Sequence, residues 1–276
     1  MFDLYEASKD LYKAANIFQQ VLDKKIYVIS ANRKLLQKGS NTNIIIVFND
    51  YWKTCMPSRD CPCKFTPKKL YINLTRVARF HRCMLLDQLF NANLFYRGYN
   101  TFAKRVVPET DLYFKMYPNS CINKMNFNIL DVKNLYKRNP NYFVPYQACK
   151  NSFVYLATET LVTNERMFFS EKIYKPIAIG MPFMVLGNPG TLSVLKALGY
   201  ETFSKWFDED YDLDYDIKDR IQIIVKNLKT YSDYTPNDLV KIRKEMATVC
   251  KKNLEIYKVH NKQNDLYNSI QKVLNV

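Results

Sequence analysis

Short apolar runs alternate with segments of helical periodicity along most of the chain. Apolar runs occur at residues 25–30 (KIYVIS), 43–49 (NIIIVFN) and 69–74 (KLYINL), each bounded by polar residues, and the first two are rich in β-branched residues. Continuous runs of this kind are typical of strands that are buried on both faces of a parallel sheet. We therefore predict three buried strands within the first 74 residues.

Two segments beside these runs carry apolar residues at helical spacing. Residues 1–22 and residues 79–95 each favour an amphipathic helix. The apolar positions are Leu4, Leu11, Ala15, Phe18 and Leu22 in the first segment and Met84, Leu85, Leu86, Leu89 and Phe90 in the second.

The second half of the chain repeats the alternation more clearly. Its pattern predicts a strand at 152–160, a helix at 170–180, a strand at 182–187, a helix at 190–200 and an almost wholly helical stretch from about 217. Strands that alternate with helices indicate βαβ units and a parallel sheet. The predicted class is therefore α/β, with Rossmann-type parallel sheets and a helical C-terminus.

The middle of the chain, residues 97–147, is less regular and rich in Asn, Tyr and Lys. We predict short strands there at 111–117 (DLYFKMY) and 127–132 (FNILDV). We divide the chain into a short N-terminal α/β part, residues 1–65, and a larger Rossmann-like domain with C-terminal helices, residues 66–276.

Charge narrows the range of partners. Forty-one Lys and Arg residues against 26 Asp and Glu residues give a net charge of +15. Such an excess attracts nucleotide phosphates, nucleic acid or an acidic membrane surface. Part of it is concentrated in residues 63–82, which contain no acid and carry Lys64, Lys68, Lys69, Arg76, Arg79 and Arg82.

Cysteine and hydropathy patterns indicate where the protein works. Seven scattered cysteines favour reduced thiols, and Cys55, Cys61 and Cys63 lack a fourth ligand at a usual zinc spacing, so we predict no metal site. The chain has no run of about eighteen apolar residues, and its N-terminus has no basic start followed by an apolar block. We expect a cytoplasmic protein without a membrane span.

Two polar clusters follow predicted strands and open predicted helices. Residues 75–82 follow the strand at 69–74, and residues 170–175 follow the strand at 152–160. Helix N-termini at the carboxyl ends of parallel strands suit phosphate groups. Basic side chains at two such places could hold a diphosphate from both sides, and Gly187 could bring backbone close to a ligand. The candidate diphosphate-binding residues are Arg76, Arg79, Arg82, Ser170, Lys172 and Lys175.

Glu171 is unexpected beside phosphate, because a carboxylate repels it. It fits a ligand that also has vicinal hydroxyls, such as a ribose, since a carboxylate accepts hydrogen bonds from both. The alternative is a structural helix start, with Ser170 as the cap, Glu171 beside the helix dipole and Lys175 in solvent. Likewise, the segment GNPG at 187–190 is compatible with an ordinary turn.

The segment FFSEKIYKPIAIGMPFMVLG resembles the donor-site segment of inverting glycosyltransferases of the α1,3-fucosyltransferase type. In that family a [ST]-E-K at a helix start precedes a strand of the form P-hydrophobic-V-hydrophobic-G. The segment KKLYINLTRVARFHRCMLLDQL looks like the family's strand, polar turn, arginine and helix. A group of phage and bacterial glycosyltransferase-like proteins is still more similar, over residues 170–212.

The resemblance implies a GT-B-like architecture and a nucleoside-diphosphate sugar of UDP or GDP type as donor. It implies no metal and no permanently bound cofactor. Glu171 would hold the donor ribose, Lys172 the diphosphate, and Arg82 or Arg76 the diphosphate from the other strand end. The chain departs from the family at Lys175-Pro176, where the family has an apolar or alanine-rich helix, and its N-terminal part is short.

An inverting transfer needs a base for the acceptor hydroxyl. The candidates are His81, beside the basic cluster, Asp50, at the end of the second strand, and Glu159, at the end of the strand at 152–160. A structural role for His81 and turn-forming roles for the two acids stay open. The acidic segment 208–216 (DEDYDLDYD) is interpreted as a solvated loop before a helix.

The resemblance, together with the two polar clusters, predicts a glycosyltransferase whose acceptor is unknown. The net charge motivates the hypothesis of an anionic acceptor, such as viral DNA with hydroxylated bases; a glycan is the other candidate. The alternative function is a non-catalytic basic protein that binds nucleic acid or glycans and has a degenerate nucleotide pocket. The oligomeric state is not predicted.

Overall fold

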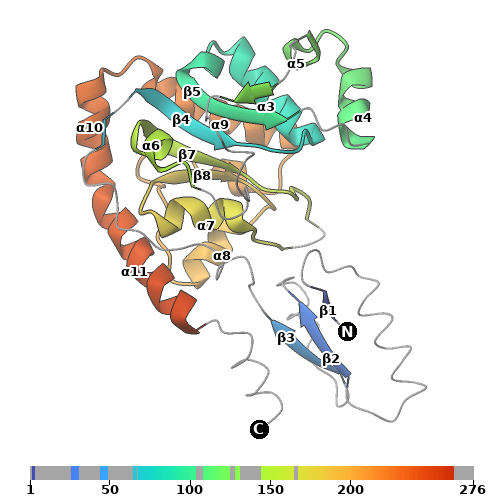
Figure 1. Cartoon of the computed structure of the whole chain (residues 1–276), viewed down its shortest axis with the longest axis vertical. Coiled ribbons are helices and arrows are strands. Elements are labelled where there is room, and N and C mark those ends of the chain that lie inside the picture. Colours follow the sequence, from blue (N-terminus) through green and yellow to red (C-terminus); the bar gives the residue numbers. More distant parts are fainter. Residues whose placement is uncertain are drawn as a thin grey trace.

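The computed structural model describes residues 2–3, 26–30, 44–48, 65–66, 68–103, 108–124, 128–130, 144–164 and 167–263 of the chain. These residues form two separate sheets (Figure 1). The predicted boundary at residue 65 falls between the sheets and stays a prediction.

The first sheet has three parallel strands in the order β1-β2-β3. Strands β2 (Ile26–Ser30) and β3 (Ile44–Phe48) confirm the two predicted apolar strands. Strand β1 (Phe2–Asp3) begins where a helix was predicted, so the prediction is wrong for these two residues. Their backbone pairs with the free edge of β2, with Phe2 opposite Ile29, and this pairing overrides the local helical pattern. The rest of the predicted helix lies outside the described residues.

The second sheet has five strands in the order β6-β5-β4-β7-β8. Strands β4 (Lys69–Leu74), β5 (Gly98–Ala103), β7 (Ser152–Thr158) and β8 (Phe183–Leu186) are parallel, and β6 (Asn128–Leu130) is antiparallel at the edge. All seven residues of β7 are buried, as expected for a continuous apolar run between two neighbouring strands. The predicted α/β class with a parallel sheet is confirmed.

The chain crosses this sheet in two directions from β4. Helix α3 (Phe80–Asn91) leads from β4 to β5, and helix α7 (Glu171–Ala178) leads from β7 to β8 on the other side of β4. Right-handed crossovers in opposite directions place their helices on opposite faces of the sheet. The switch in direction lies between β4 and β7, where open α/β sheets bind ligands.

The remaining helices cover the sheet and close the fold. Helix α9 packs against β4, β8 and α3, whereas α11 packs against α7. Helices α10 and α11 run along one side of the sheet in Figure 1. Together α9, α10 and α11 confirm the predicted helical C-terminus. The bounds are α6 (Tyr146–Lys150), α8 (Thr191–Ala197), α9 (Ile217–Ser232), α10 (Pro236–Glu245) and α11 (Ala247–Gln263), with 3-10 turns η2 (Phe95–Arg97) and η3 (Asp210–Asp212).

The predicted strand at 111–117 is wrong. The segment belongs to helix α4 (Pro108–Met116), which is followed by the short helix α5 (Cys121–Lys124). Pro108 at the first helical position and the acids Glu109 and Asp111 in the first turn are helix-start signals that outweigh the local aromatic pattern. The prediction at 127–132 is confirmed for residues 128–130, which form β6.

Candidate functional site

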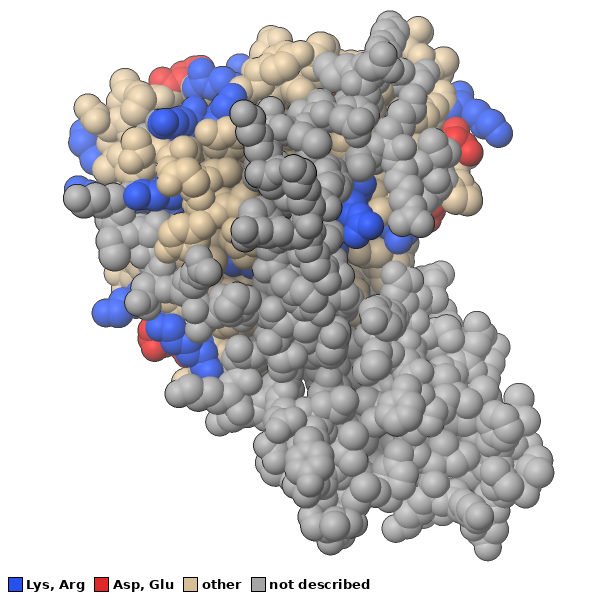
Figure 2. All heavy atoms as spheres, in the orientation of Figure 1, with Lys and Arg blue, Asp and Glu red and all other residues tan. Residues whose placement is uncertain are grey.

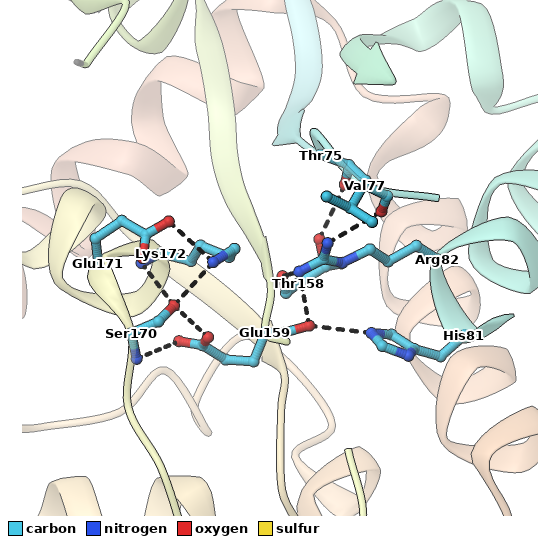
Figure 3. Close-up of polar contacts among 9 residues, drawn as sticks. All are labelled: Thr75, Val77, His81, Arg82, Thr158, Glu159, Ser170, Glu171 and Lys172. Carbon is cyan, nitrogen blue, oxygen red and sulfur yellow. Dashed lines mark hydrogen bonds and ion pairs between the residues drawn. The ribbon is translucent and has the colours of Figure 1, made fainter. Parts of the chain in front are cut away.

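The guanidinium of Arg82 joins the carboxyl ends of β4 and β7. Its Nη2 donates to the backbone oxygens of Thr158 and Glu159 at 3.0 and 2.9 Å, and its Nη1 donates to Val77 at 3.1 Å (Figure 3). The side chain is buried, and burial lowers its pKa to about 10, so it is still charged at neutral pH. Both terminal nitrogens are therefore committed to the backbone of this edge.

His81 reaches the same strand end from the first turn of α3. Its Nε2 lies 3.0 Å from the backbone oxygen of Glu159. A carbonyl oxygen only accepts, so Nε2 carries the proton and Nδ1 carries the lone pair. Burial, followed by the charge of Arg82, lowers the pKa of His81 to about 3. The ring is therefore neutral at ordinary pH and weakly basic.

Glu159 connects the two predicted clusters. Its backbone oxygen accepts from Arg82 and His81, while its carboxylate accepts from the backbone N–H of Ser170 at 3.1 Å and from the Ser170 hydroxyl (Figure 3). Burial raises the pKa of the Glu159 carboxyl, against the opposing charge of Lys172. One residue after β7 therefore ties the start of α3 to the start of α7.

Ser170 caps helix α7, as one of the two interpretations of the sequence predicted. Its hydroxyl oxygen accepts from the backbone N–H of Lys172 at 3.2 Å, which matches one of the unpaired N–H groups of the helix start. The Lys172 Nζ lies 3.1 Å from the same oxygen and 2.9 Å from Glu171 Oε1. Ser170, Glu171 and Lys172 thus form one compact group at the N-terminus of α7.

The two lysines of this group differ in exposure. The Lys172 side chain is 16% exposed, whereas Lys175 is only 4% exposed, so the interpretation of Lys175 as solvated is wrong. Burial lowers the pKa of Lys175 to about 8, against the favourable charge of Glu171. For Glu171, burial raises the pKa, but the charges of Lys172 and Lys175 together outweigh it and the net pKa is lowered. Lys172 is thus the more accessible of the two cations.

Arg76 and Arg79, two other predicted site residues, do not share the side-chain contacts of this group. Arg76 is exposed, and Arg79 forms an ion pair with Glu109 at 3.3 Å. Asp50, like the three cysteines at 55, 61 and 63, lies outside the described residues. The structure therefore brings together Arg82, His81, Glu159, Ser170, Glu171 and Lys172, with Lys175 buried one helical turn further on.

Sequence reasoning missed Arg220 of α9. It donates to the backbone oxygens of Tyr211 at 2.6 Å, Gly187 at 2.8 Å and Val162 at 3.2 Å, and so ties together three loops at the carboxyl edge. Gly187 therefore takes part through its carbonyl group. The available signal was an arginine next to the apolar positions of an amphipathic helix. When such a charge is buried, it needs several acceptors.

Two threonines at the ends of the central strands, Thr75 directly after β4 and Thr158 as the last residue of β7, were also missed. The hydroxyls of Thr75 and Thr158 lie 3.1 Å apart, and Thr75 donates to Asn73 Oδ1 at 2.7 Å. Two buried donors near this edge, Arg82 Nε and Asn73 Nδ2, have no acceptor among the described residues. For both threonines, the available signal was a polar residue at the carboxyl end of a buried strand.

The acidic segment 208–216 is only partly solvated. Asp216 caps α9, so the predicted helix start is confirmed, but Tyr211 and Asp212 are buried. The Asp212 carboxylate accepts from the backbone N–H of Leu192 at 2.8 Å, and burial raises its pKa to about 7. The loop was expected to be exposed throughout because the sequence does not show that Asp212 reaches the start of α8.

The charge excess is not gathered over this site alone. Figure 2 shows Lys and Arg side chains at several separate places on one face, with few acidic side chains among them. A cavity lined by described residues lies further along α3 than the strand-end site, which is the group formed by Arg82, His81, Glu159, Ser170, Glu171 and Lys172. No described helix has the length and apolar character needed to cross a bilayer.

No protein-family model matches the chain, and comparison with curated proteins finds no significant match. The resemblance to α1,3-fucosyltransferase-type enzymes therefore stays a prediction from the sequence.

Proposed function

We propose that the protein is a glycosyltransferase of GT-B-like architecture that takes a nucleoside-diphosphate sugar of UDP or GDP type. One observation carries the proposal. The Ser170–Glu171–Lys172 group at the start of α7 and the first turn of α3 converge on Glu159, at the switch point between β4 and β7. This is the place where open parallel sheets bind nucleotides.

The start of α7 offers the chemistry that a diphosphate requires. Lys172 supplies a partly exposed ammonium group, and the helix start supplies the positive end of the dipole. The negative charge that develops on a departing diphosphate is stabilised by both. Glu171, held ionised by its two lysine neighbours, is suited to accept hydrogen bonds from ribose hydroxyls.

The candidate bases differ in fitness for their role. A general base works best with a pKa near the working pH, and the pKa of about 3 makes His81 a poor one. The raised pKa of Glu159 suits a base better, but its carboxylate is buried and holds Ser170. We infer that the strand-end site contributes donor binding and leaving-group stabilisation, and that Asp50, which lies outside the described residues, stays the candidate base.

One observation favours the alternative, a basic binding protein with a degenerate pocket. Within the described residues Lys172 is paired with Glu171, and Arg82 is paired with backbone carbonyls, so the cluster satisfies much of its own hydrogen-bonding need. Such a cluster stabilises the fold without a nucleotide. Hydrolysis of the donor separates the two functions, because a transferase releases sugar to water and a binding module does not.

The test is thermal stabilisation of the full chain by UDP, GDP, CDP, dTDP and their sugars, followed by assay of donor hydrolysis. A ligand that binds only the folded state raises the midpoint. We expect one nucleotide to stand out and its shift to disappear in Lys172→Ala. Lys241→Ala is the matched control, because Lys241 also pairs with a carboxylate but lies on α10 and is exposed.

A flat panel would refute the donor site, and binding without hydrolysis would favour the binding protein. A nucleotide shift that survives Lys172→Ala would move the site elsewhere. The hypothesis of a DNA acceptor has its own test, since binding through phosphates weakens steeply with added salt. Absence of DNA binding at low salt would leave a glycan as the candidate acceptor.

A further inference from the structure

A cavity of about 410 Å³ lies beside helix α3, further along the helix than the strand-end site. Met84, Gln88 and Asn91 line it from one side of α3, since residues four and three positions apart share a helix face. The opposite wall comes from α4, α5 and the segment that joins them. Its volume falls within the range of pockets that bind small molecules.

The floor of the cavity is organised around Asp87. This carboxylate accepts from the Tyr113 hydroxyl, from Cys121 Sγ at 2.7 Å and from the backbone N–H of Ile122 at 3.2 Å. Burial is the main cause that raises the pKa of Tyr113, and the contact with Asp87 adds to it. The same two causes raise the pKa of Cys121 to about 12. Both groups therefore keep the protons that they donate. The floor joins α3, α4 and α5, and it is held by hydrogen bonds within the protein.

One wall of the cavity is aromatic. The rings of Tyr113 and Tyr117 lie 4.8 Å apart between centroids, and Phe80 packs edge-on against Tyr113 at 5.2 Å. Tyr117 lines the cavity and is 38% exposed, whereas Tyr113 is only 2% exposed. Aromatic side chains supported in this way offer a rigid surface that is apolar on its face and polar at its hydroxyl.

The polar lining is almost uncharged. Among the described residues that line the cavity, Asp87 and Lys218 are the only ionic side chains, one of each sign, in a chain whose net charge is +15. The other polar side chains are neutral: the amides of Gln88, Asn91 and Asn119, the hydroxyls of Ser120, Tyr113 and Tyr117, and the thiol of Cys121. Amides and hydroxyls both donate and accept, which matches a ligand whose own groups do both.

We propose that this cavity binds a carbohydrate, with one or two neutral sugar units placed against the Tyr113–Tyr117 wall. The hydroxyls of the sugar exchange hydrogen bonds with the amides on α3 and at residue 119, and the apolar face of the sugar ring covers Tyr117, the exposed ring of the pair. Charge balance excludes polyanions as the preferred ligand, because the lining holds no excess of positive charge. The site goes beyond the proposed function, since nothing in it depends on a nucleotide.

The test is titration of the full chain with cellotriose, maltotriose and chitotriose, followed by saturation-transfer NMR. We expect at least one of the three to bind, and Tyr117→Ala to weaken its binding about tenfold. Tyr96→Ala is the matched control, because Tyr96 is 71% exposed and is not among the described residues that line the cavity. Asn91→Ala changes an exposed lining residue and guards against misfolding of the tyrosine variant; we expect about a threefold loss.

Three results would overturn the proposal. These are no binding of any of the three sugars at millimolar concentration, preferential binding of choline or inorganic phosphate, and equal weakening in Tyr96→Ala. Failure here is distinct from failure of the donor site. Lys172→Ala leaves sugar binding intact, and Tyr117→Ala leaves the thermal shift by nucleotide intact, if the two sites are independent.

Discussion

Helix α3 takes part in two polar environments that use their charges differently. In its first turn, Arg82 and His81 are buried and contact backbone oxygens at the strand ends. Further along, Asp87 is satisfied by neutral donors and borders a cavity. A buried cation that is held by backbone oxygens acts as a structural tie, whereas a satisfied group beside open space can orient a ligand. The comparison separates stability from binding, and the following substitutions test that separation.

The largest effect is expected for Arg82→Met. The substitution removes hydrogen bonds to three backbone oxygens and leaves these acceptors buried without their cation. We expect a loss of about 3 kcal/mol in the free energy of unfolding, measured by chemical denaturation. Arg76→Ala, in the same basic segment but exposed, is the control and changes stability by less than about 0.5 kcal/mol. Equal effects would show that the strand-end cluster is not a structural tie.

Lys175→Met tests how the buried charge of Lys175 changes the free energy of unfolding as the pH is varied. Burial depresses the pKa of Lys175 to about 8 from 10.5, so between these values the unfolded chain binds more protons than the folded one. Stability therefore rises with pH in this window and is lost as pH falls towards 8, by about 3 kcal/mol. Denaturation curves at pH 8 and 10.5 should show this rise in the natural chain and not in Lys175→Met. Parallel pH profiles would contradict the assignment.

Ser170→Ala tests the connection through Glu159 between the start of α3 and the start of α7. It removes the cap of α7 and the hydroxyl partner of Glu159 together. We expect a loss of about 1 to 2 kcal/mol in unfolding free energy, because a cap and one hydrogen bond are lost. Ser170→Thr keeps the hydroxyl and should recover most of the loss. If the threonine variant were as unstable as the alanine variant, packing and not hydrogen bonding would be the cause.

Tyr117→Ala should have the smallest effect on stability and a clear effect on sugar binding. The ring is partly exposed, so its removal costs about 1 kcal/mol or less in unfolding free energy. Arg82→Met is expected to show the opposite balance. A loss of several kcal/mol in Tyr117→Ala would make the aromatic wall part of the core, and the contrast between the two regions of α3 would fail.

Local sequence predicted several elements closely. The run KLYINL forms β4 over the predicted residues, and Ser170 caps α7 at the predicted place. Both rest on interactions between near neighbours: a short apolar run favours a buried strand, and a serine reaches an N–H two residues away. The helix-start signals of α4 were equally local, and the prediction of a strand there gave them too little weight.

The sequence predicted which residues belong to the candidate site better than it predicted the contacts between them. The sequence by itself determined the α/β class, the positions of two polar clusters after strands and the cap of α7, because apolar runs and caps act over a few residues. Only the tertiary structure decided that Arg82 meets backbone oxygens 76 and 77 residues away and that Lys175 and Asp212 are buried. The physical reason is that desolvation and pairing of a charge depend on neighbours that the fold brings from distant strands and helices.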